Sequence, residues 1–406
     1  MNNKIKNSNQ NGQKKYLWAK NQMPILRKLV QKYSQNNTLK GLDIGVCLHI
    51  TKETSVLIMG LKETGANVSL CSANPLSTKT EVRDFLKESG IRIFTDKNYN
   101  LDSFYSNMDK VLDTKPQIII DDGGELHKKA IRRKDPIRGG TEETTSGVNR
   151  LRALSDIPYP VIAVNQSITK HLFDNTFGTG QSIMESIIKT TSVLIASKRI
   201  VVCGYGWVGK GVSKYARGMG AKVSVTETNP LKAIEAYLDG FEVARLDKLL
   251  SHNDIFITCT GQINVIGRQH FDYLKDGAIL CNAGHFDVEI DVKALDTIDP
   301  DAFEPVQNVT CYKIRDGLNK KKVFLLARGR VVNLIGSEGN SPQVMDLSFT
   351  NQFLSIIYLF KYMEKLPKKV SPPPNKIQNQ ISKLALQAFG LDIDNLTLQQ
   401  KEYFKS

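Results

Sequence analysis

Several features are scarce or absent in this sequence of 406 residues, and each absence narrows the possibilities. No apolar run approaches the length of a membrane span, and the N-terminus MNNKIKNSNQNGQKK lacks the hydrophobic segment of a signal peptide. The six cysteines are scattered, and no two of them have C-x-x-C spacing, which disfavours a disulfide framework. We therefore expect a cytoplasmic protein with buried free thiols and no metal site.

The charge and the length set further bounds. The formal net charge of +14 is consistent with a nucleic-acid binder, but the lysines are spread along the chain and no nucleic-acid-binding motif accompanies them. We expect neither nucleic acid nor a membrane as a partner. The length and the hydrophobic fraction of 41% suggest two or three packed domains.

The most informative stretch is 201–230, which reads VVCGYGWVGKGVSKYARGMGAKVSVTETNP. Its apolar start is typical of a buried parallel strand, and Gly204, Gly206 and Gly209 give G-x-G-x-x-G. These glycines allow a tight turn, close approach of backbone to a pyrophosphate, and close packing of the following helix. A second strand leads to Glu227, whose carboxylate can accept hydrogen bonds from both ribose hydroxyls of NAD and would repel the 2′-phosphate of NADP. The pattern predicts an NAD site.

Strands and helices alternate along most of the chain, which predicts an α/β fold of two Rossmann-like doubly wound domains with a short C-terminal helical segment. We expect a disordered N-terminus over residues 1–15, a substrate-binding domain over 16–179 and an NAD-binding domain over 180–335. Helices that return to the substrate domain are expected over 336–365, and a linker with a short tail over 366–406. One helix is expected from Tyr16 to about Tyr33.

Polar residues follow several predicted strands outside the NAD-binding stretch. Open α/β sheets bind ligands at the carboxyl ends of their strands, so such residues can share one cleft. They are His49, Thr51 and Glu53; Asp121 and Asp122; Glu142 and Glu143; Asn165, Lys170, Asp174 and Asn175; and His285 and Asp287. Several also have a structural explanation. His49 can cap the helix that begins near Thr51, and Asp122 can belong to a turn. Glu142 and Glu143 can lie in a solvated loop, and Lys170 and Asp174 can form an i,i+4 surface ion pair. Their place after several separate strands favours the shared cleft.

Seven segments resemble the signature segments of the S-adenosyl-L-homocysteine hydrolase family, in that family's order and spacing, over roughly residues 16–365. They are CLHITKETSVLI, IIIDDGGEL, GGTEETTSGV, VNQSITKHLFDN, VVCGYGWVGKG, CNAGHFDVEID and GRVVNL. The segment 179–182, Trp207 and the short C-terminus resemble the archaeal and thermophile branch of that family.

The resemblance implies a reaction that begins with oxidation of the substrate's ribose at the 3′-hydroxyl by bound NAD. The C4′ proton is then removed, homocysteine leaves by elimination, water adds, and the hydride returns to C3′, giving adenosine and L-homocysteine. By the same resemblance, Lys170 and Asp174 orient and deprotonate the 3′-hydroxyl. Asp122 is the acid–base at C4′, His49 assists departure of the thiol and activation of water, and Glu143 holds a ribose hydroxyl.

The resemblance also assigns the remaining contacts. Thr51 and Glu53 match positions near the adenine, where a carboxylate accepts from the exocyclic amine, and Asn175 supports the 3′ end. Further substrate-binding positions are His285, Asn340 and Met345. The cofactor-binding positions are Gly204, Gly206, Val208, Gly209, Glu227, Asn229, Thr260, Gly261 and Asn333. Because the family is usually tetrameric, the resemblance implies a homo-oligomer, either a tetramer or a dimer.

One segment departs from the family. Where the family carries Gly-His-Pro, this chain reads Gly339-Asn340-Ser341-Pro342; the family's histidine gates the substrate channel with a histidine–phenylalanine pair that matches His285 and Phe286. The family's long C-terminal tail is also absent, so we expect NAD to be held less tightly or other subunit contacts to compensate.

The expected reaction is therefore hydrolysis of S-adenosyl-L-homocysteine, with the same chemistry on another nucleoside thioether, such as S-inosyl-homocysteine, as the alternative. A plain NAD dehydrogenase, a non-catalytic NAD-binding regulator and a nucleic-acid binder are further alternatives. The retained acid–base residues argue against the regulator.

Overall fold

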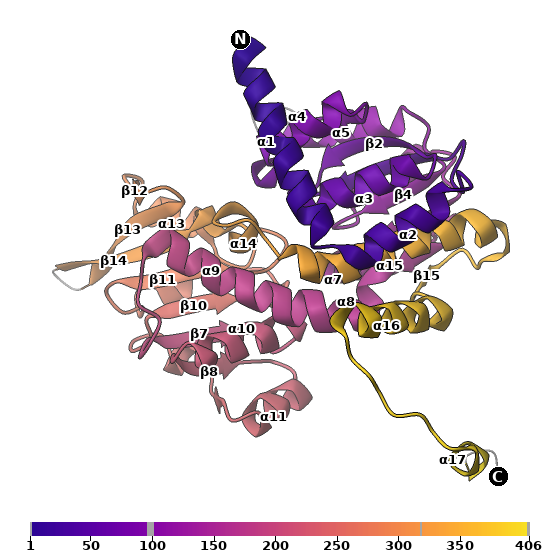
Figure 1. Ribbon diagram of the computed structural model, residues 1–406. Helices are drawn as coiled ribbons and strands as arrows, with labels where there is room; N and C mark the ends of the chain where they lie inside the picture. Colours follow the sequence, from indigo (N-terminus) through magenta and orange to yellow (C-terminus); the bar gives the residue numbers. More distant parts are fainter. Residues whose placement is uncertain (1, 96–100, 317–318, 404–406) are drawn as a thin grey trace.

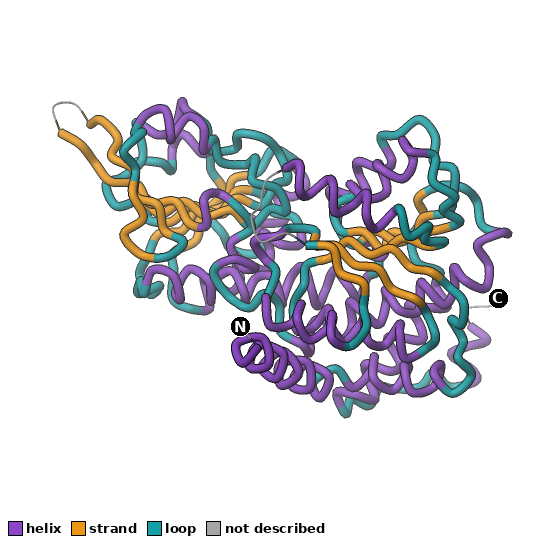
Figure 2. The backbone as a smooth tube through the Cα atoms, turned by 90° about the horizontal axis from the view of Figure 1, so that it is seen from above, coloured by secondary structure: helices purple, strands orange, loops and turns teal. Residues whose placement is uncertain are grey.

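The computed structural model describes residues 2–95, 101–316 and 319–403, which form two α/β lobes side by side (Figures 1 and 2). Within the described residues, the first lobe contains a parallel sheet whose strand order is β15-β6-β5-β4-β1-β2-β3. The second has the order β12-β13-β14-β11-β10-β7-β8-β9, in which β12, β13 and β14 pair antiparallel and the rest pair parallel. The predicted fold class is confirmed.

The first lobe is built mainly from the N-terminal half of the chain. Its strands are β1 (Asp43–Leu48), β2 (Asn67–Ser72), β3 (Arg92–Phe94), β4 (Ile118–Asp121), β5 (Gly139–Glu142), β6 (Val161–Ala163) and β15 (Val370–Ser371). Its helices are α1 (Asn2–Asn21), α2 (Pro24–Ser34), α3 (Lys52–Glu63), α4 (Thr80–Glu88), α5 (Leu101–Leu112), α6 (Glu125–Arg133), α7 (Thr145–Arg152), α15 (Pro342–Tyr362) and α16 (Asn375–Phe389).

The second lobe contains the predicted NAD-binding stretch. Its strands are β7 (Arg199–Cys203), β8 (Lys222–Thr226), β9 (Glu242–Val243), β10 (Ile255–Thr258), β11 (Ala278–Asn282), β12 (Phe303–Val306), β13 (Val309–Asp316) and β14 (Asn319–Leu326). Its helices are α9 (Thr179–Thr191), α10 (Trp207–Gly218), α11 (Pro230–Leu238), α12 (Arg268–Phe271), α13 (Val292–Ile298) and α14 (Val332–Ile335). No helix in the described ranges is long and apolar enough to cross a membrane.

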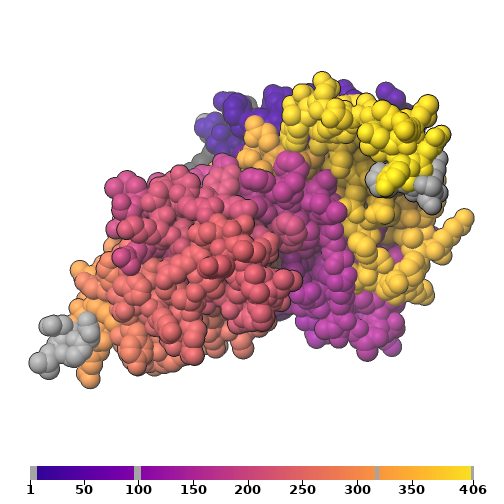
Figure 3. Space-filling model, turned by 90° about the horizontal axis from the view of Figure 1, so that it is seen from below, coloured from indigo at the N-terminus to yellow at the C-terminus, as the bar shows by residue number. Residues whose placement is uncertain are grey.

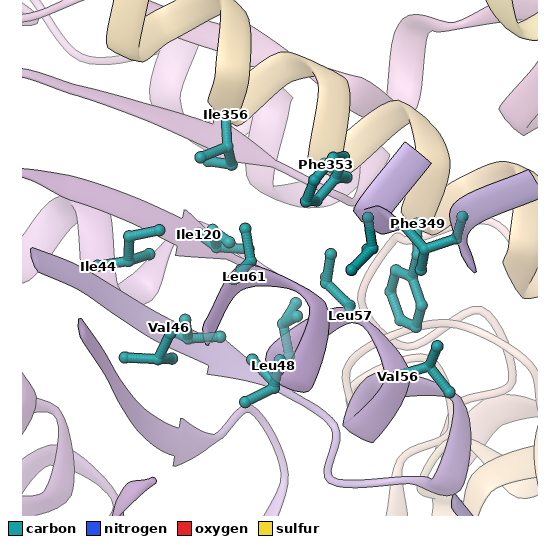
Figure 4. Packing of buried hydrophobic residues seen from close by; sticks show 14 of the residues in the cluster. Ile44, Val46, Leu48, Val56, Leu57, Leu61, Ile120, Phe349, Phe353 and Ile356 are labelled. Atoms are coloured by element: carbon teal, nitrogen blue, oxygen red, sulfur yellow. The ribbon is translucent and has the colours of Figure 1, made fainter. Parts of the chain in front are cut away.

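The core of the first lobe fixes a late segment of the chain onto an early one. Figure 4 shows strand residues packed against α3 and α15; the buried side chains include Ile44, Val46, Ile120, Leu57, Leu61, Phe353 and Ile356. Burying each such side chain contributes roughly 1.5–3 kcal/mol. This packing holds α15 in the first lobe and so places its N-terminal end beside the carboxyl ends of the strands.

The prediction of a disordered N-terminus is wrong for the described residues, because α1 begins at Asn2. Helix α1 lies against α4, and Gly12 makes this approach possible. A Cβ at Gly12 would lie 1.9 Å from the backbone oxygen of Glu81, so a larger residue would push the helices apart. Lys15 adds an ion pair of 2.7 Å with the Glu81 carboxylate.

The single helix predicted from Tyr16 to Tyr33 is two helices in the structure, with a break between α1 and α2. Pro24 begins α2, and the residue before it, Met23, has φ −119° and ψ 63°. A proline disfavours the helical conformation of the residue that precedes it, which explains the break.

The C-terminal segment is more ordered than the predicted linker and tail. Strand β15 pairs parallel with β6 at the edge of the first sheet, and α16 buries Ile377, Ile381 and Ala385, which recur at helical spacing. The last helix, α17 (Leu398–Tyr403), lies away from both lobes in Figure 1. In the space-filling view, the C-terminal residues (yellow) lie on the side of the first lobe (Figure 3).

Candidate active site

Three of the predicted catalytic residues directly follow neighbouring strands of the first sheet. His49 follows β1, Asp122 follows β4, and Glu143 follows β5. The register pairs Cys47 with Asp121 and Asp121 with Glu142, so the carboxyl ends of these strands are level. The expected gathering of strand-end residues is therefore present in the structure.

The first group of side chains brings two histidines to one carboxylate. Nε2 of His49 lies 3.5 Å from Oδ2 of Asp122, and Nδ1 of His285 lies 3.7 Å from Oδ1 of the same side chain. Burial lowers the pKa of His49 to about 4 and also lowers the pKa of His285. Both imidazoles are therefore neutral near pH 7.

The hydrogen bonds around Ser77 define the tautomer of His49. The Ser77 hydroxyl donates to the backbone oxygen of Asn74 at 2.6 Å, so it accepts from Nδ1 of His49, 2.6 Å away. A neutral imidazole that donates through Nδ1 has its lone pair on Nε2. Nε2 of His49 faces Asp122 and is the atom that can accept a proton. Sequence reasoning missed Ser77.

His285 reaches this group from the other lobe. It lies in the loop after β11 with Phe286, and a Cβ at Gly123 would lie 2.8 Å from Nε2 of His285. The guanidinium of Arg150 lies 3.8 Å from the centre of the Phe286 ring, a cation–π distance. The two lobes are thus closed against each other at the site.

The second group surrounds Lys170. This residue ends α8 (Ile168–Lys170), and a π-helical segment follows over His171–Gly178. Nζ of Lys170 lies 3.3 Å from Asp174, 3.1 Å from Oδ1 of Asn175 and 4.0 Å from Glu143. A π-helix is rare and is frequently found at functional sites; here it brings Asp174 and Asn175 to the same ammonium group.

The charged side chains of the second group shift one another's pKa. Burial raises the pKa of Glu143 to about 8, against the influence of Lys170 and with a further contribution from Asp174. Burial alone would lower the pKa of Lys170, but Asp174 and Glu143 outweigh it and raise it. Both carboxyl oxygens of Glu143 are buried and have no hydrogen-bond partner among the described residues. Because buried polar atoms are normally paired, this pair of oxygens suggests a ligand contact.

Two buried carboxyl groups that were not assigned a role hold the Asp122 loop. Asp121 accepts from the backbone N–H of Asp122 at 2.9 Å, and Glu142 accepts from the backbone N–H of Gly123 at 2.9 Å. Burial raises the pKa of both Asp121 and Glu142. His127 lies beside them with both ring nitrogens engaged, by the Tyr159 hydroxyl and the Thr141 backbone oxygen. Because both ring nitrogens of His127 already have hydrogen-bond partners, they are not free to bind a metal. Asp121, Glu142 and His127 therefore act as a structural support.

The predicted adenine contacts lie at the start of α3. Thr51, not His49, caps this helix by accepting from the N–H of Thr54 at 3.3 Å. Glu53 is buried and lies 3.1 Å from Nζ of Lys52, which also lies 3.2 Å from Glu338. Burial raises the pKa of Glu53, with Lys52 acting in the opposite direction.

A cavity of about 210 Å³ adjoins this region and is lined in part by Trp18, Lys52, Gln181, Glu338 and Asn340. It lies where the departure from the family pattern predicts the substrate entrance. Met345, half-buried in the first turn of α15, packs against the core of the first lobe.

The glycine-rich turn of the second lobe fits a dinucleotide. Gly204 has φ +101°, a conformation that favours glycine, and a Cβ at Gly209 would lie 1.9 Å from the backbone oxygen of Gly204. A Cβ at Gly206 would meet no atom within 4 Å, so the space in front of the α10 N-terminus is open. Unpaired N–H groups at such a helix end favour a pyrophosphate. Val208, in the first turn of α10, packs against the core.

Glu227 lies directly after β8, as predicted. Its two oxygens accept from the backbone N–H groups of Tyr205, Thr228 and Asn229 at 2.7, 2.7 and 3.0 Å. Burial alone would raise the pKa of Glu227, but these hydrogen bonds outweigh it and lower it. The side chain of Asn229 caps α11, so its oxygen already has a structural use.

Glu289 is a further cofactor-side residue that sequence reasoning missed. It accepts from the N–H of Thr260 and of Gly261, each at 2.9 Å, and so fixes both predicted cofactor contacts. Asn333 donates to Ser182 at 3.0 Å, and its Oδ1 is buried with no hydrogen-bond partner among the described residues. The signal for Glu289 was its place in the quoted segment CNAGHFDVEID.

Comparison with known proteins identifies the family. A model described as S-adenosyl-L-homocysteine hydrolase matches residues 3–135, and one for the NAD-binding domain of the same enzyme matches residues 175–339. Adenosylhomocysteinase of Sulfolobus acidocaldarius is 45% identical over 399 residues, which cover 97% of this chain and 95% of that protein. The chain belongs to the S-adenosyl-L-homocysteine hydrolase family.

Other relatives in the S-adenosyl-L-homocysteine hydrolase family match over a similar length. Adenosylhomocysteinase of Aquifex aeolicus is 45% identical over 97% of this chain and 96% of that protein. S-inosyl-L-homocysteine hydrolase of Methanocaldococcus jannaschii is 43% identical, also over 97% and 96%. The sequence-based predictions of the family, of an enzyme and of NAD as the cofactor are confirmed.

Proposed function

We propose that this enzyme hydrolyses S-adenosyl-L-homocysteine to adenosine and L-homocysteine by temporary oxidation of the ribose. One observation carries the proposal: a buried Lys170 lies between Asp174 and Glu143, while the His49–Asp122 pair lies at the same edge of the sheet. The first set suits a hydroxyl that is to be oxidised. The second supplies a base and a proton carrier for the elimination that follows.

When bound, NAD would supply an acceptor for the C3′ hydride and a donor for its return, so that its redox state would be unchanged after a turnover. The Lys170–Asp174 pair, with Asn175 beside it, acts on the 3′-hydroxyl. The ammonium group of Lys170 donates to the hydroxyl oxygen and orients it, and the Asp174 carboxylate accepts the hydroxyl proton. The unpaired oxygens of Glu143 hold a ribose hydroxyl. The residues around the cofactor that fit its parts are Gly204, Gly206, Val208, Gly209, Glu227, Asn229, Thr260, Gly261 and Asn333.

Asp122 and His49 act at the other end of the ribose. A ketone at C3′ makes the C4′ proton acidic, and the Asp122 carboxylate removes it. His49 is neutral and has its lone pair on Nε2, which faces Asp122 at 3.5 Å. It can pass the proton taken up by Asp122 to the departing sulfur and then take the proton from the water that adds. His285 packs beside them and, with Phe286, keeps this end closed.

A second candidate substrate differs from the first in its nucleobase. One relative is named S-inosyl-L-homocysteine hydrolase, and its substrate has a 6-oxo group in place of the 6-amino group. The buried Glu53 beside Lys52 favours the amine, because an ionised carboxylate accepts hydrogen bonds and offers none. We therefore place adenosine first, near Thr51 and Glu53, and the inosyl compound second.

We also propose that the enzyme is a cytoplasmic homo-oligomer. All six cysteines are unpaired, as in a reducing compartment. Helix α11 exposes Leu231, Ile234, Tyr237 and Leu238, and contiguous apolar patches of this kind mark interaction sites. Sedimentation would distinguish a tetramer, a dimer and a monomer.

The proposed activity is tested by incubating the purified protein with S-adenosyl-L-homocysteine and, separately, with its inosyl analogue. Free thiol and the released nucleoside are measured in each case. We expect thiol and adenosine from the first compound and a slower reaction with the second. No thiol from either compound would contradict the assignment.

A further inference from the structure

Asn340 occupies the position at which this chain departs from its family, and its amide group is fully used. Its Nδ2 donates to Oδ1 of Asp174 at 2.8 Å, and its Oδ1 accepts from the Ser182 hydroxyl at 2.8 Å. A longer contact of 3.4 Å joins Nδ2 to Thr179. The Asn340 amide thus lies between Asp174 and the first turns of α9.

The hydrogen bonds continue from Ser182 to the cofactor side. Asn333 donates its Nδ2 to the Ser182 hydroxyl at 3.0 Å. Each group therefore donates in the same direction, from Asn333 to Ser182 to Asn340 to Asp174. This direction leaves Oδ1 of Asn333, which has no hydrogen-bond partner among the described residues, as the atom offered to the cofactor.

The direction of the chain depends on an amide at position 340. Asp174, as a carboxylate, only accepts. The Ser182 hydroxyl can donate to Oδ1 of Asn340 at 2.8 Å or to the backbone oxygen of Thr179 at 3.3 Å. The amide of Asn340 supplies the nearer acceptor together with a donor, both at fixed positions. The space beside Asn340 is also matched to it. A Cβ at Gly178 would lie 3.1 Å from both Cγ and Nδ2 of Asn340 and 2.6 Å from Val344.

The charged groups that face Asp174 explain what this arrangement does. Its other oxygen accepts from the Ser348 hydroxyl of α15 at 2.7 Å and lies 3.3 Å from Lys170. Lys170 in turn faces Glu143 at 4.0 Å. Asn340 holds one oxygen of the carboxylate and Ser348 holds the other, which fixes the orientation of the oxygen that faces the ammonium group of Lys170.

We propose that Asn340 is a positioning residue that fixes the Asp174 carboxylate and, through Ser182, the amide orientation of Asn333. It thereby couples the ribose site to the cofactor site. The inference rests on the proposed role of Asp174 in ribose oxidation. Asn340 acts only through Asp174 and Ser182, so its loss affects the oxidation step more than substrate binding.

The test uses the full-length enzyme with bound NAD, mixed with adenosine in a single turnover, with the rise of bound-NADH absorbance as the readout. Asn340→Ala removes the donor to a charged group, and we expect oxidation about 10- to 100-fold slower with KM for adenosine changed less than about threefold. Ser182→Ala interrupts the chain without touching Asp174; we expect a weaker NAD complex and a smaller effect on oxidation. Gln343→Ala removes an exposed amide three positions from Asn340 and should behave as wild type.

A near-isosteric variant covers the case in which Asn340→Ala does not fold. Asn340→Asp places a second carboxyl group against Asp174, so the two share a proton. The acid limb of its oxidation rate should move to higher pH, and an unmoved limb would count against the proposal.

Asp174→Asn separates this inference from the proposed function. If that variant oxidises adenosine slowly while Asn340→Ala oxidises it at the wild-type rate, the positioning role of Asn340 is wrong and the proposed function stands. If Asp174→Asn oxidises adenosine normally, the proposed role of Asp174 fails first. Slow oxidation in both Asp174→Asn and Asn340→Ala, with normal oxidation in Gln343→Ala, supports the inference.

Discussion

The Asp122 carboxylate lies between His49 of its own lobe, at 3.5 Å, and His285 of the other lobe, at 3.7 Å. Strand pairing between β1 and β4 brings Asp122 to His49, whereas closure of the two lobes brings it to His285. Because burial lowers the pKa of both imidazoles, neither is a cation near pH 7. Asp122 supplies the carboxyl group of this cluster, and its place between the two imidazoles suits a base for a carbon-bound proton.

Asp122→Asn should separate the two halves of the reaction. The amide keeps the size of the side chain but cannot accept the C4′ proton, so oxidation continues and elimination stops. We expect bound-NADH absorbance to form with S-adenosyl-L-homocysteine while thiol release falls by roughly 100-fold or more. The exposed Asp287→Asn serves as the matched control. Thiol release at the wild-type rate would refute the role of Asp122.

Glu227→Ala should weaken NAD binding. The carboxylate is oriented by three backbone N–H groups, and its loss removes charge-assisted hydrogen bonds to the ribose. We expect the dissociation constant for NAD, measured by calorimetry, to rise roughly 10- to 100-fold. Asp247→Ala, an exposed acid in the same lobe, should leave it unchanged. Equal affinities in the two variants would overturn the ribose assignment.

Glu53→Gln should change the preference for the nucleobase. A carboxylate accepts from the 6-amino group, whereas glutamine can also donate to a 6-oxo group. We expect the ratio of kcat/KM for the adenosyl and inosyl substrates to move toward the inosyl compound by about 10-fold or more. Glu63→Gln, at the exposed far end of α3, is the control. An unchanged ratio of kcat/KM would show that Glu53 does not contact the nucleobase.

Glu143→Gln should alter the pH dependence of stability. Burial raises the pKa of Glu143 from 4.5 to about 8 in the folded protein. The stability that it contributes is therefore fully present below about pH 4.5 and is lost as the pH rises to about 8. The neutral variant avoids this loss. Its thermal midpoint should exceed that of the wild type by an amount that grows from pH 5 to 8, reaching roughly 5 °C, and then levels off. A difference that is constant with pH would contradict the buried state of Glu143.

The sequence alone predicted the parts of the fold that follow from local pattern. Apolar strands alternating with helices predicted two doubly wound sheets, and the glycines with Glu227 predicted the second lobe's turn. The order of α1 was not predictable in this way. Its residues are polar and lysine-rich, and its contact with α4 depends on Gly12, whose role becomes visible only when both helices are in place.

The site was predicted to the extent that its residues directly follow strands. His49, Asp122 and Glu143 were found because strand ends meet at one edge of a sheet. Ser77, which supports His49, and Glu289, which supports Thr260 and Gly261, were missed because they act through tertiary hydrogen bonds. Only the place of Glu289 in the segment CNAGHFDVEID could have drawn attention to it. The amide of Asn340 was noted only as a departure at the entrance. Its contact with Asp174 joins residues far apart in the sequence.

The central claim is that NAD is oxidised again within every turnover. The most direct measurement follows thiol release and bound-NADH absorbance in the same reaction with S-adenosyl-L-homocysteine in excess over enzyme. We expect many thiols per subunit while NADH stays at or below one per subunit and returns to its starting value when substrate is exhausted. Accumulation of NADH in step with product would contradict it, because the enzyme would then be an ordinary dehydrogenase.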